Sequence, residues 1–225
     1  MPPRRSRRSA VWIRQSIFGG ETDGSERAKG WGGVAVEWAE LKAWRRSERQ
    51  RLLALRTATA PAERQLWGQQ IEARLRLLLA EQPGIVLGVY WPFQAEFDPR
   101  PLIDWLVAAG SAVALPAVVD KKGPLEYRAW RPGEKLVDGV WNIPVPERRQ
   151  IVVPQAVLAP LVGFDRDCYR LGYGGGYFDR TLAALAPRPW AIGVGFELSR
   201  LETIYPQDFD IPMDLIVTEA RVRRR

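Results

Sequence analysis

The chain has 225 residues, of which 46% are hydrophobic, and this supplies enough apolar side chain for one sizeable α/β domain. It contains one cysteine, Cys168, and no histidine, which excludes an intrachain disulfide, Cys/His zinc sites, Ser-His-Asp triads and Cys-His catalytic pairs. The formal net charge is +7, but the excess lies at the start of the chain: residues 1 to 56 contain 13 Lys and Arg against 6 Asp and Glu, and residues 57 to 225 contain 20 of each.

The first 35 residues are basic and contain Gly, Ser and Pro without a sustained hydrophobic period. Their first twenty positions contain five Arg and no acidic residue. We therefore expect a disordered basic arm over residues 1 to 35, followed by a single α/β domain over residues 36 to 225. Four explanations of the arm stay open: a dispensable tail, an organelle transit peptide, an RNA tether, or a start codon assigned too far upstream.

Two helices are predicted next. Residues 35 to 59 contain no Gly or Pro and are rich in good helix formers. A second helix starts at Pro61, a residue suited to the first helical turn, and ends at the Glu-Gln-Pro-Gly sequence of residues 81 to 84. Apolar residues of this helix are expected on its inner side: Leu66, Ile71, Leu75, Leu78 and Leu79.

Strands and helices then alternate along the chain. Strands are predicted at residues 85 to 91, 112 to 119, 125 to 130, 156 to 165 and 190 to 197, with a last strand near 214 to 222. A helix at 99 to 109 has Asp98 as its cap and Gly110 after its end, and a short helix covers 177 to 186. This alternation predicts a three-layer α/β/α fold with a mainly parallel sheet.

A glycine-rich loop, RLGYGGGYFDR at residues 170 to 180, joins the fourth of the buried strands to the short helix. Glycines lack Cβ atoms, so the backbone can turn its N–H groups toward an anion, and the N-terminus of the following helix adds partial positive charge. Arg170 and Arg180 bring full charges. Asp179 can cap the helix or hold Mg²⁺ beside bound phosphates. The loop therefore predicts a phosphate site, with an ordinary tight turn as the alternative.

Better-known phosphate loops fit less well. A Walker A loop needs Gly-Lys-Ser/Thr, which is absent. The dinucleotide fingerprint needs a glycine where Tyr177 stands, although Glu197 at the end of the next strand keeps that interpretation open.

Four segments, YWPFQAEFDPRPLI, WNIPVPE, RLGYGGGYFDR and DLIVTEA, together resemble the 5-formyltetrahydrofolate cyclo-ligase family, also called methenyltetrahydrofolate synthetases, over about residues 42 to 220. The resemblance implies a three-layer fold like that of sugar-phosphate isomerases and CoA transferases. It also implies an enzyme that uses ATP and Mg²⁺ to convert 5-formyltetrahydrofolate into 5,10-methenyltetrahydrofolate, ADP and phosphate. The formyl oxygen would attack the γ-phosphate, the folate nitrogen at position 10 would then attack the activated carbon, and phosphate would leave.

The resemblance implies an ATP and metal site. Asp179 is similar to a Mg²⁺ ligand, and Asp214 resembles the second acidic position of the metal site. Arg45 and Arg49 match a Lys-x-x-x-Arg pair that reaches ATP phosphates from the first helix, although a register on Lys42 and Arg46 also fits the spacing. The phosphate cradle would comprise Arg170, Leu171, Gly172, Tyr173, Gly174, Gly175, Gly176, Tyr177 and Phe178.

The same resemblance implies a folate site. Glu96 aligns with the family's pterin-binding acid, and Trp91 with a neighbouring folate contact. Tyr177 takes the place of an aromatic residue against the folate and is, with Arg170, a candidate catalytic residue. Tyr127 and Trp141 are further candidates for the pocket wall. The blander alternatives are a loop acid for Glu96, a strand-edge carboxylate for Asp214, core packing for the aromatic rings and a solvated face for the helix arginines.

The chain departs from the family pattern before its last strand, where a common histidine is replaced within YPQDFDIPMD. Two other functions stay open: an RNA-associated protein that binds through the basic arm, and a nucleotide or sugar-phosphate enzyme on a related fold. The neutral body argues against nucleic acid binding by the folded domain. No apolar run approaches the roughly 18 residues of a membrane span, so we expect a cytoplasmic protein without a membrane partner. We also expect a monomer.

Overall fold

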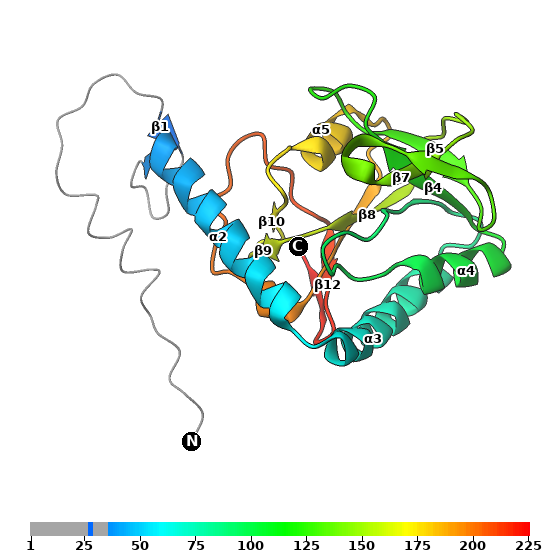
Figure 1. Ribbon diagram of the computed structural model, residues 1–225, viewed down its shortest axis with the longest axis horizontal. Coiled ribbons are helices and arrows are strands. Elements are labelled where there is room, and N and C mark those ends of the chain that lie inside the picture. Colours follow the sequence, from blue (N-terminus) through cyan, green and yellow to red (C-terminus); the bar gives the residue numbers. More distant parts are fainter. Residues whose placement is uncertain (1–26, 29–35) are drawn as a thin grey trace.

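The computed structural model describes residues 27–28 and 36–225 (Figure 1). Its main strands are β3 (Val86–Gly88), β4 (Ala112–Ala117), β5 (Glu126–Trp130), β8 (Ala156–Pro160), β11 (Trp190–Val194), β12 (Leu215–Val217) and β13 (Val222–Arg224). They form a seven-stranded sheet in the order β13-β12-β11-β8-β3-β4-β5. The inner strands from β12 to β4 are parallel, and the two edge strands, β13 and β5, are antiparallel to their neighbours.

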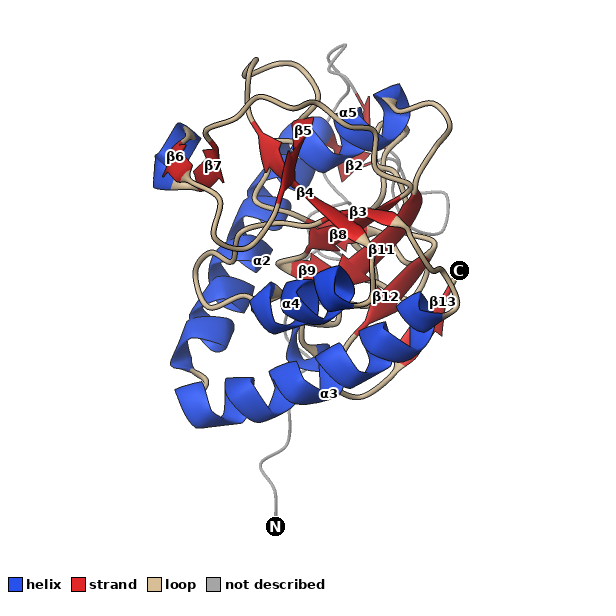
Figure 2. Ribbon diagram, turned by 90° about the vertical axis from the view of Figure 1, so that its right-hand side faces the viewer, coloured by secondary structure: helices blue, strands red, loops and turns tan. Residues whose placement is uncertain are grey.

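Helices cover both faces of this sheet (Figure 2). The helices are α2 (Trp38–Ala58), α3 (Pro61–Ala80), α4 (Arg100–Ala108) and α5 (Tyr177–Ala184), with short 3-10 turns η2 (Val140–Asn142) and η3 (Glu197–Ser199). Leu75 of α3 and Ile103 of α4 pack in one cluster with Leu158, whereas Leu182 of α5 packs in another with Ala159. Adjacent residues of a strand point to opposite faces, so the two clusters lie on opposite sides of the sheet. The predicted three-layer fold with a mainly parallel sheet is confirmed.

Helix α2 packs beside the sheet rather than on one of its faces (Figure 1). It covers the short hairpin of β9 (Gly163–Phe164) and β10 (Arg170–Leu171), where Leu52 packs against Val162, Leu171 and Ile204. A Cβ added to Gly163 would lie 2.6 Å from Leu52 Cδ1, so glycine permits this close approach. The helix face that carries Leu52 therefore points toward the glycine loop that follows β10.

Most predicted elements are present, with several differences. The strand predicted at 156 to 165 is divided between β8 and β9, and the strand predicted near 214 to 222 is divided between β12 and β13. The predicted strand at 85 to 91 ends at Gly88, and the chain then leaves the sheet in a loop. Leu66 is 59% exposed, so its predicted place on the inner side of α3 is wrong; the first fully buried residue of the helix is Ile71. The proline-rich connection after β5 contains an unpredicted hairpin, β6 (Leu136–Asp138) with β7 (Pro144–Pro146).

The predicted caps of α4 agree with the structure in part: Pro99, not Asp98, is the N-cap residue, and it makes no side-chain cap hydrogen bond. Asp98 Oδ1 accepts a hydrogen bond from the N–H of Arg100 at 3.0 Å. Gly110 follows the helix with φ +82°, a left-handed conformation that glycine adopts without strain.

Little of the amino-terminal region is described. Strand β1 (Arg27–Ala28) pairs antiparallel with β2 (Val36–Glu37), which leads directly into α2. The disordered arm that we predict for residues 1 to 35 otherwise lies outside the described residues. None of the described helices is long and apolar enough to cross a membrane.

Candidate active site

A cavity of about 940 Å³ opens where the inner strands β3, β4 and β8 end. Its walls come from the chain after β3, the chain after β4, helix α2 and the glycine loop. Open α/β sheets bind ligands outside the carboxyl ends of their parallel strands, and this cavity has that position. The predicted residues that line it are Arg45, Arg49, Trp91, Glu96, Trp141, Arg170, Leu171, Gly172, Tyr173, Gly174, Gly175, Gly176, Tyr177, Phe178 and Asp179.

The glycine loop has the backbone geometry of an anion cradle. Gly174 and Gly176 adopt φ of +99° and +65°, values that L side chains rarely take. A Cβ added to Gly172 would lie 2.5 Å from Arg170 Nη1, so the loop needs glycine there to admit the guanidinium. Helix α5 starts directly after Gly176, which has no capping side chain, and the first N–H groups of the helix therefore stay available to a ligand.

Arg170 and Asp179 form a nearly buried ion pair under the loop. Arg170 Nη2 donates to Asp179 Oδ2 at 2.7 Å, and the two side chains are 5% and 16% exposed. Asp179 Oδ1 accepts the N–H of Ile211 at 3.2 Å. Arg170 Nε is buried without a hydrogen-bond partner in the described part of the chain. An unpaired guanidinium nitrogen beside a glycine cradle fits a phosphate oxygen.

Arg180, the other arginine of the loop segment, also lines the cavity and supports the loop through hydrogen bonds to backbone carbonyls. Its Nη1 donates to the Gly175 carbonyl at 2.8 Å, and its Nε donates to the Gly123 carbonyl at 3.0 Å. Its guanidinium also lies 4.8 Å from the Tyr177 ring centroid. Arg180 therefore joins the loop after β4 to the glycine loop.

Of the two possible helix registers, the one on Arg45 and Arg49 faces the cavity. Arg49 Nε donates to the Gly172 carbonyl at 2.7 Å, and its terminal nitrogens have no hydrogen-bond partner among the described residues. Burial, and next the charge of Arg45, lower the pKa of Arg49. Lys42 and Arg46 are exposed and do not line the cavity.

Glu96 is presented by a strained tight turn. Gln94 and Ala95 have φ of +45° and +61°, and the N–H of Glu96 donates to the Phe93 carbonyl at 3.1 Å. Left-handed conformations cost a non-glycine residue about 1–2 kcal/mol each, so surrounding contacts must hold this turn. The carboxylate accepts the N–H of Phe93 at 2.8 Å and the hydroxyl of Tyr173 at 2.9 Å. Burial raises the pKa of Glu96 to about 7, although the charge of Arg56 opposes the shift.

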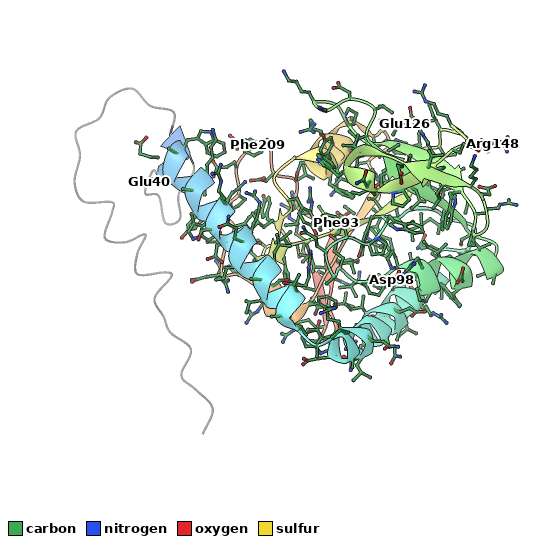
Figure 3. All side chains as sticks on the ribbon, in the orientation of Figure 1. Glu40, Phe93, Asp98, Glu126, Arg148 and Phe209 are labelled. Atoms are coloured by element: carbon green, nitrogen blue, oxygen red, sulfur yellow. The ribbon has the colours of Figure 1, made fainter. Side chains whose placement is uncertain are left out.

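Aromatic rings surround the mouth of the cavity. The ring centroids of Phe93 and Tyr173 lie 5.9 Å apart, and the rings of Trp141 and Tyr177 meet nearly at a right angle with centroids 5.7 Å apart. Figure 3 shows Phe93 between α2 and α4, and Phe209 beside the first turns of α2. Trp141 is 61% exposed, which leaves one of its faces available for a ligand. The cavity thus combines flat apolar walls with a cationic loop.

Two predicted residues lie away from the cavity. Tyr127 is 2% exposed, packs against Gly88 and has no hydrogen-bond partner for its hydroxyl within the described residues. Asp214 binds Arg188 at 2.9 Å and the N–H of Ala191 at 2.7 Å, and it is not part of the cavity wall. In the described chain, no group of three or more His, Cys, Asp or Glu residues is placed to hold a metal ion. Asp179 is therefore the predicted metal ligand that reaches the cavity.

Sequence reasoning missed Arg56 and Asp210. Arg56 follows Arg45, Arg49 and Leu52 at helical spacing, a periodicity that places it on the same face of α2. Asp210 binds Arg45 at 2.5 Å across the cavity wall and has no comparable local signal.

Comparison with known proteins agrees with this architecture. The sequence matches the 5-formyltetrahydrofolate cyclo-ligase family over residues 41–219. It is 30% identical over 174 residues to the 5-formyltetrahydrofolate cyclo-ligase of Escherichia coli, covering 74% of this chain and 96% of that protein. With the enzyme of that name from Mycolicibacterium smegmatis it shares 31% over 146 residues, covering 61% and 75%. The fold is similar to that of Aquifex aeolicus 5,10-methenyltetrahydrofolate synthetase, with a TM-score of 0.71, 27% identity and coverage of 80% of this chain and 92% of that chain.

Proposed function

The chain belongs to the 5-formyltetrahydrofolate cyclo-ligase family, and we propose that it uses ATP and Mg²⁺ to cyclise 5-formyltetrahydrofolate to 5,10-methenyltetrahydrofolate in the cavity described above. One observation carries the proposal: a glycine cradle with an unpaired arginine nitrogen and a separate carboxylate, Glu96, line the same cavity. The first suits the phosphates of a nucleotide, and the second suits the amino-pyrimidine edge of a pterin.

The nucleotide phosphates would bind between α2 and the glycine loop. The terminal nitrogens of Arg49 are unpaired donors on this wall, and the first turn of α5 supplies backbone N–H groups. Arg170 also lines the cavity, and its Nε is buried without a partner among the described residues. The remaining cradle residues, from Leu171 to Phe178, would fit around the phosphates with their backbone. Each of these contacts favours negative charge, and together they support a polyphosphate ligand.

Asp179 fits Mg²⁺ in this arrangement. Mg²⁺ commonly binds one or two carboxylates together with substrate phosphates, and it keeps several waters. Each Asp179 oxygen already accepts one hydrogen bond and keeps a second lone pair that can face a cation. Asp214 would have to leave Arg188 to take part, so we propose Asp179 as the protein ligand. When bound, Mg²⁺ would neutralise phosphate charge beside Arg170.

Glu96 fits the folate. Phe93 N–H and the Tyr173 hydroxyl each bind a different carboxylate oxygen, which leaves a lone pair on both oxygens for a pair of N–H donors. Such donors favour the ionised carboxylate, so folate binding would lower the pKa of Glu96 from about 7. Trp91 and Tyr177 line the cavity as flat surfaces for the ring system.

The proposed chemistry depends on positioning and on charge stabilisation. The formyl oxygen would attack the γ-phosphate and ADP would leave. The nitrogen at position 10 would then attack the activated carbon, and the carbon–oxygen bond would break as phosphate leaves with the proton that this nitrogen loses. Negative charge on the transferred group would be stabilised by Arg170 and by the N-terminus of α5, while Tyr177 would hold the folate against the cradle. None of these steps requires a histidine base.

The test is ADP release by the purified protein in ATP and Mg²⁺, with and without 5-formyltetrahydrofolate, while the absorbance of the methenyl product is recorded. We expect folate-dependent ADP release matched by methenyl product. Omission of Mg²⁺, and substitution of NADH for ATP, serve as controls. A folded protein that binds ATP but gives no folate-dependent ADP would overturn the proposal.

A further inference from the structure

Arg56, near the end of α2, joins three distant parts of the chain through one guanidinium. Its Nε donates to the Gln94 carbonyl at 3.0 Å, its Nη1 to the Leu161 carbonyl at 3.2 Å and its Nη2 to the Tyr173 hydroxyl at 2.6 Å. Arg56 is only 5% exposed and forms no ion pair with any described residue. Because no carboxylate neutralises it, the positive charge of this buried arginine acts on the groups around it.

The hydroxyl of Tyr173 links this charge to Glu96. Arginine has no acceptor, so Tyr173 must accept the bond from Arg56. Its single proton is then free to be donated to Glu96 Oε1, at 2.9 Å. The direction of both hydrogen bonds is therefore fixed, and the chain Arg56–Tyr173–Glu96 ends on a carboxylate that lines the cavity.

Arg56 also supports the turn that presents Glu96. The Gln94 carbonyl that it binds belongs to the first of the two left-handed residues, Gln94 and Ala95. Such a turn persists only where neighbouring contacts determine its conformation. One side chain therefore fixes both the backbone that carries Glu96 and the hydroxyl that binds its carboxylate.

The charges around Glu96 give the arrangement an electrostatic consequence. Arg56 faces it from α2, Tyr173 from the glycine loop, Tyr90 from the chain after β3, and Asp98 lies further along its own loop. Burial raises the pKa of Glu96 to about 7, and Arg56, the Phe93 N–H and the Tyr173 hydroxyl act in the opposite direction. Loss of the hydroxyl would therefore raise the pKa of Glu96 further.

We propose, on the basis of the function proposed above, that Arg56 is a positioning residue which acts through Tyr173 to keep the Glu96 carboxylate ionised and aimed at the folate. Tyr173 lies between Gly172 and Gly174 in the phosphate cradle. The hydrogen bonds from Arg56 through Tyr173 to Glu96 therefore connect the proposed folate-binding residue Glu96 to the nucleotide loop.

Tyr173→Phe is the decisive variant, because it keeps the ring and the bonds from Arg56 to Gln94 and Leu161 but removes the hydroxyl. We expect KM for 5-formyltetrahydrofolate to rise about tenfold with KM for ATP changed less than about twofold. The acid limb of kcat/KM for folate should move upward by about one pH unit. Tyr90→Phe is the matched control: that hydroxyl donates to the Phe97 carbonyl at 2.9 Å rather than to Glu96, so the acid limb should stay in place.

Two further measurements separate this inference from ordinary structural support and from the proposed reaction. In a double-mutant cycle scored by the position of the acid limb, Arg56→Lys, which keeps the positive charge, should add little to Tyr173→Phe if Arg56 acts on Glu96 through Tyr173. The lost bonds to the Gln94 and Leu161 carbonyls should appear separately, as a lower Tm of Arg56→Lys. Carbon-13 NMR of labelled glutamate, without substrate, should report a higher pKa for Glu96 in Tyr173→Phe than in the unmodified chain. This readout does not depend on turnover, so it tests the inference even if folate-dependent ADP release is absent. An unchanged Glu96 titration and an unmoved acid limb would overturn the positioning role.

Discussion

Arg45 holds Asp210 through two side-chain hydrogen bonds, from Nη2 to Oδ2 at 2.5 Å and from Nη1 to Oδ1 at 3.3 Å, and both side chains are almost fully buried. Two more bonds reach the carbonyls of Ile204 and Tyr205. These bonds leave Arg45 little donor capacity for a ligand. The structure thus supports a bracing role for Arg45 at the cavity wall, and we expect Arg49 to make the proposed phosphate contact.

Arg45→Ala and Arg49→Ala should therefore fail in different ways. Arg45→Ala leaves the Asp210 carboxylate buried and unpaired, and we expect the free energy of unfolding to fall by about 3 kcal/mol. Arg49→Ala should weaken ATP binding by about tenfold or more through loss of a charged hydrogen bond, with a much smaller change in Tm. Thermal unfolding and ATP titration of both variants make the comparison. Equal losses of ATP affinity at unchanged stability would instead assign both arginines to the phosphates.

Asp179→Asn should abolish most Mg²⁺-dependent turnover. Asparagine keeps the shape of the side chain but loses the charge that attracts the cation, and we expect kcat to fall by about 10²–10³-fold. Alanine is a poorer choice because it would leave Arg170 without its buried partner. Rates measured across a Mg²⁺ titration give the readout.

Asp214→Asn is the matched comparison for Asp179. Asp214 lies outside the cavity wall and binds Arg188, so the variant should keep its Mg²⁺ dependence and lose some stability. A comparable loss of Mg²⁺ affinity in Asp214→Asn would show that Asp214 moves into the metal site when the ligands bind.

Glu96→Gln should weaken folate binding and make it insensitive to pH. With a pKa of about 7, Glu96 is mostly protonated at pH 6 and mostly ionised at pH 8, so folate affinity of the unmodified chain should rise between these values. In Glu96→Gln that rise should disappear, while ATP affinity stays nearly constant. Calorimetric titration of each ligand at both pH values provides the measurement, and a lost ATP affinity would contradict the assignment.

The raised pKa of Glu96 also predicts how the stability of the fold changes with pH. Because folding raises the pKa of Glu96, the folded state holds a proton that the unfolded state releases, and stability is lost as pH rises from the usual glutamate range through about 7. Glu96→Gln removes this loss. We therefore expect Tm of the variant to exceed that of the unmodified chain at pH 8 and to match it at pH 5; a variant that is less stable at pH 8 would contradict the burial argument.

Local sequence features predicted the parts of the site that are themselves local. The glycine loop, the helix after it and the glycine that follows α4 depend on neighbouring residues, and each was found from the sequence. The bonds of Arg56 to Leu161 and of Arg45 to Asp210 join residues far apart in the chain, and no periodicity reports such contacts.

Motif resemblance and helical periodicity do not show whether a side chain reaches the cavity or is buried. Position in a motif could not distinguish Tyr127, a residue of β5 whose ring packs against Gly88, from a residue that reaches the cavity. The exposed Leu66 also satisfied the helical pattern, because periodicity shows which side of a helix is apolar but not how much of the helix is covered.

Gly172→Ala tests whether the cradle depends on close approach of the backbone to a guanidinium. The added Cβ would lie 2.5 Å from Arg170 Nη1, so the guanidinium would have to move and its ion pair with Asp179 would be disturbed. We expect ATP affinity to fall at least tenfold, since a charged contact to phosphate is displaced.

Gly133→Ala is the control: its φ of +93° makes the substitution strained, but nothing lies within 4 Å and it is not in the cavity wall. That variant should lose about 1–2 kcal/mol of stability and keep its ATP affinity. If both variants lose ATP affinity in proportion to stability, the loop acts only through the fold; if Gly172→Ala alone loses it, the space left by the missing Cβ is part of the nucleotide site.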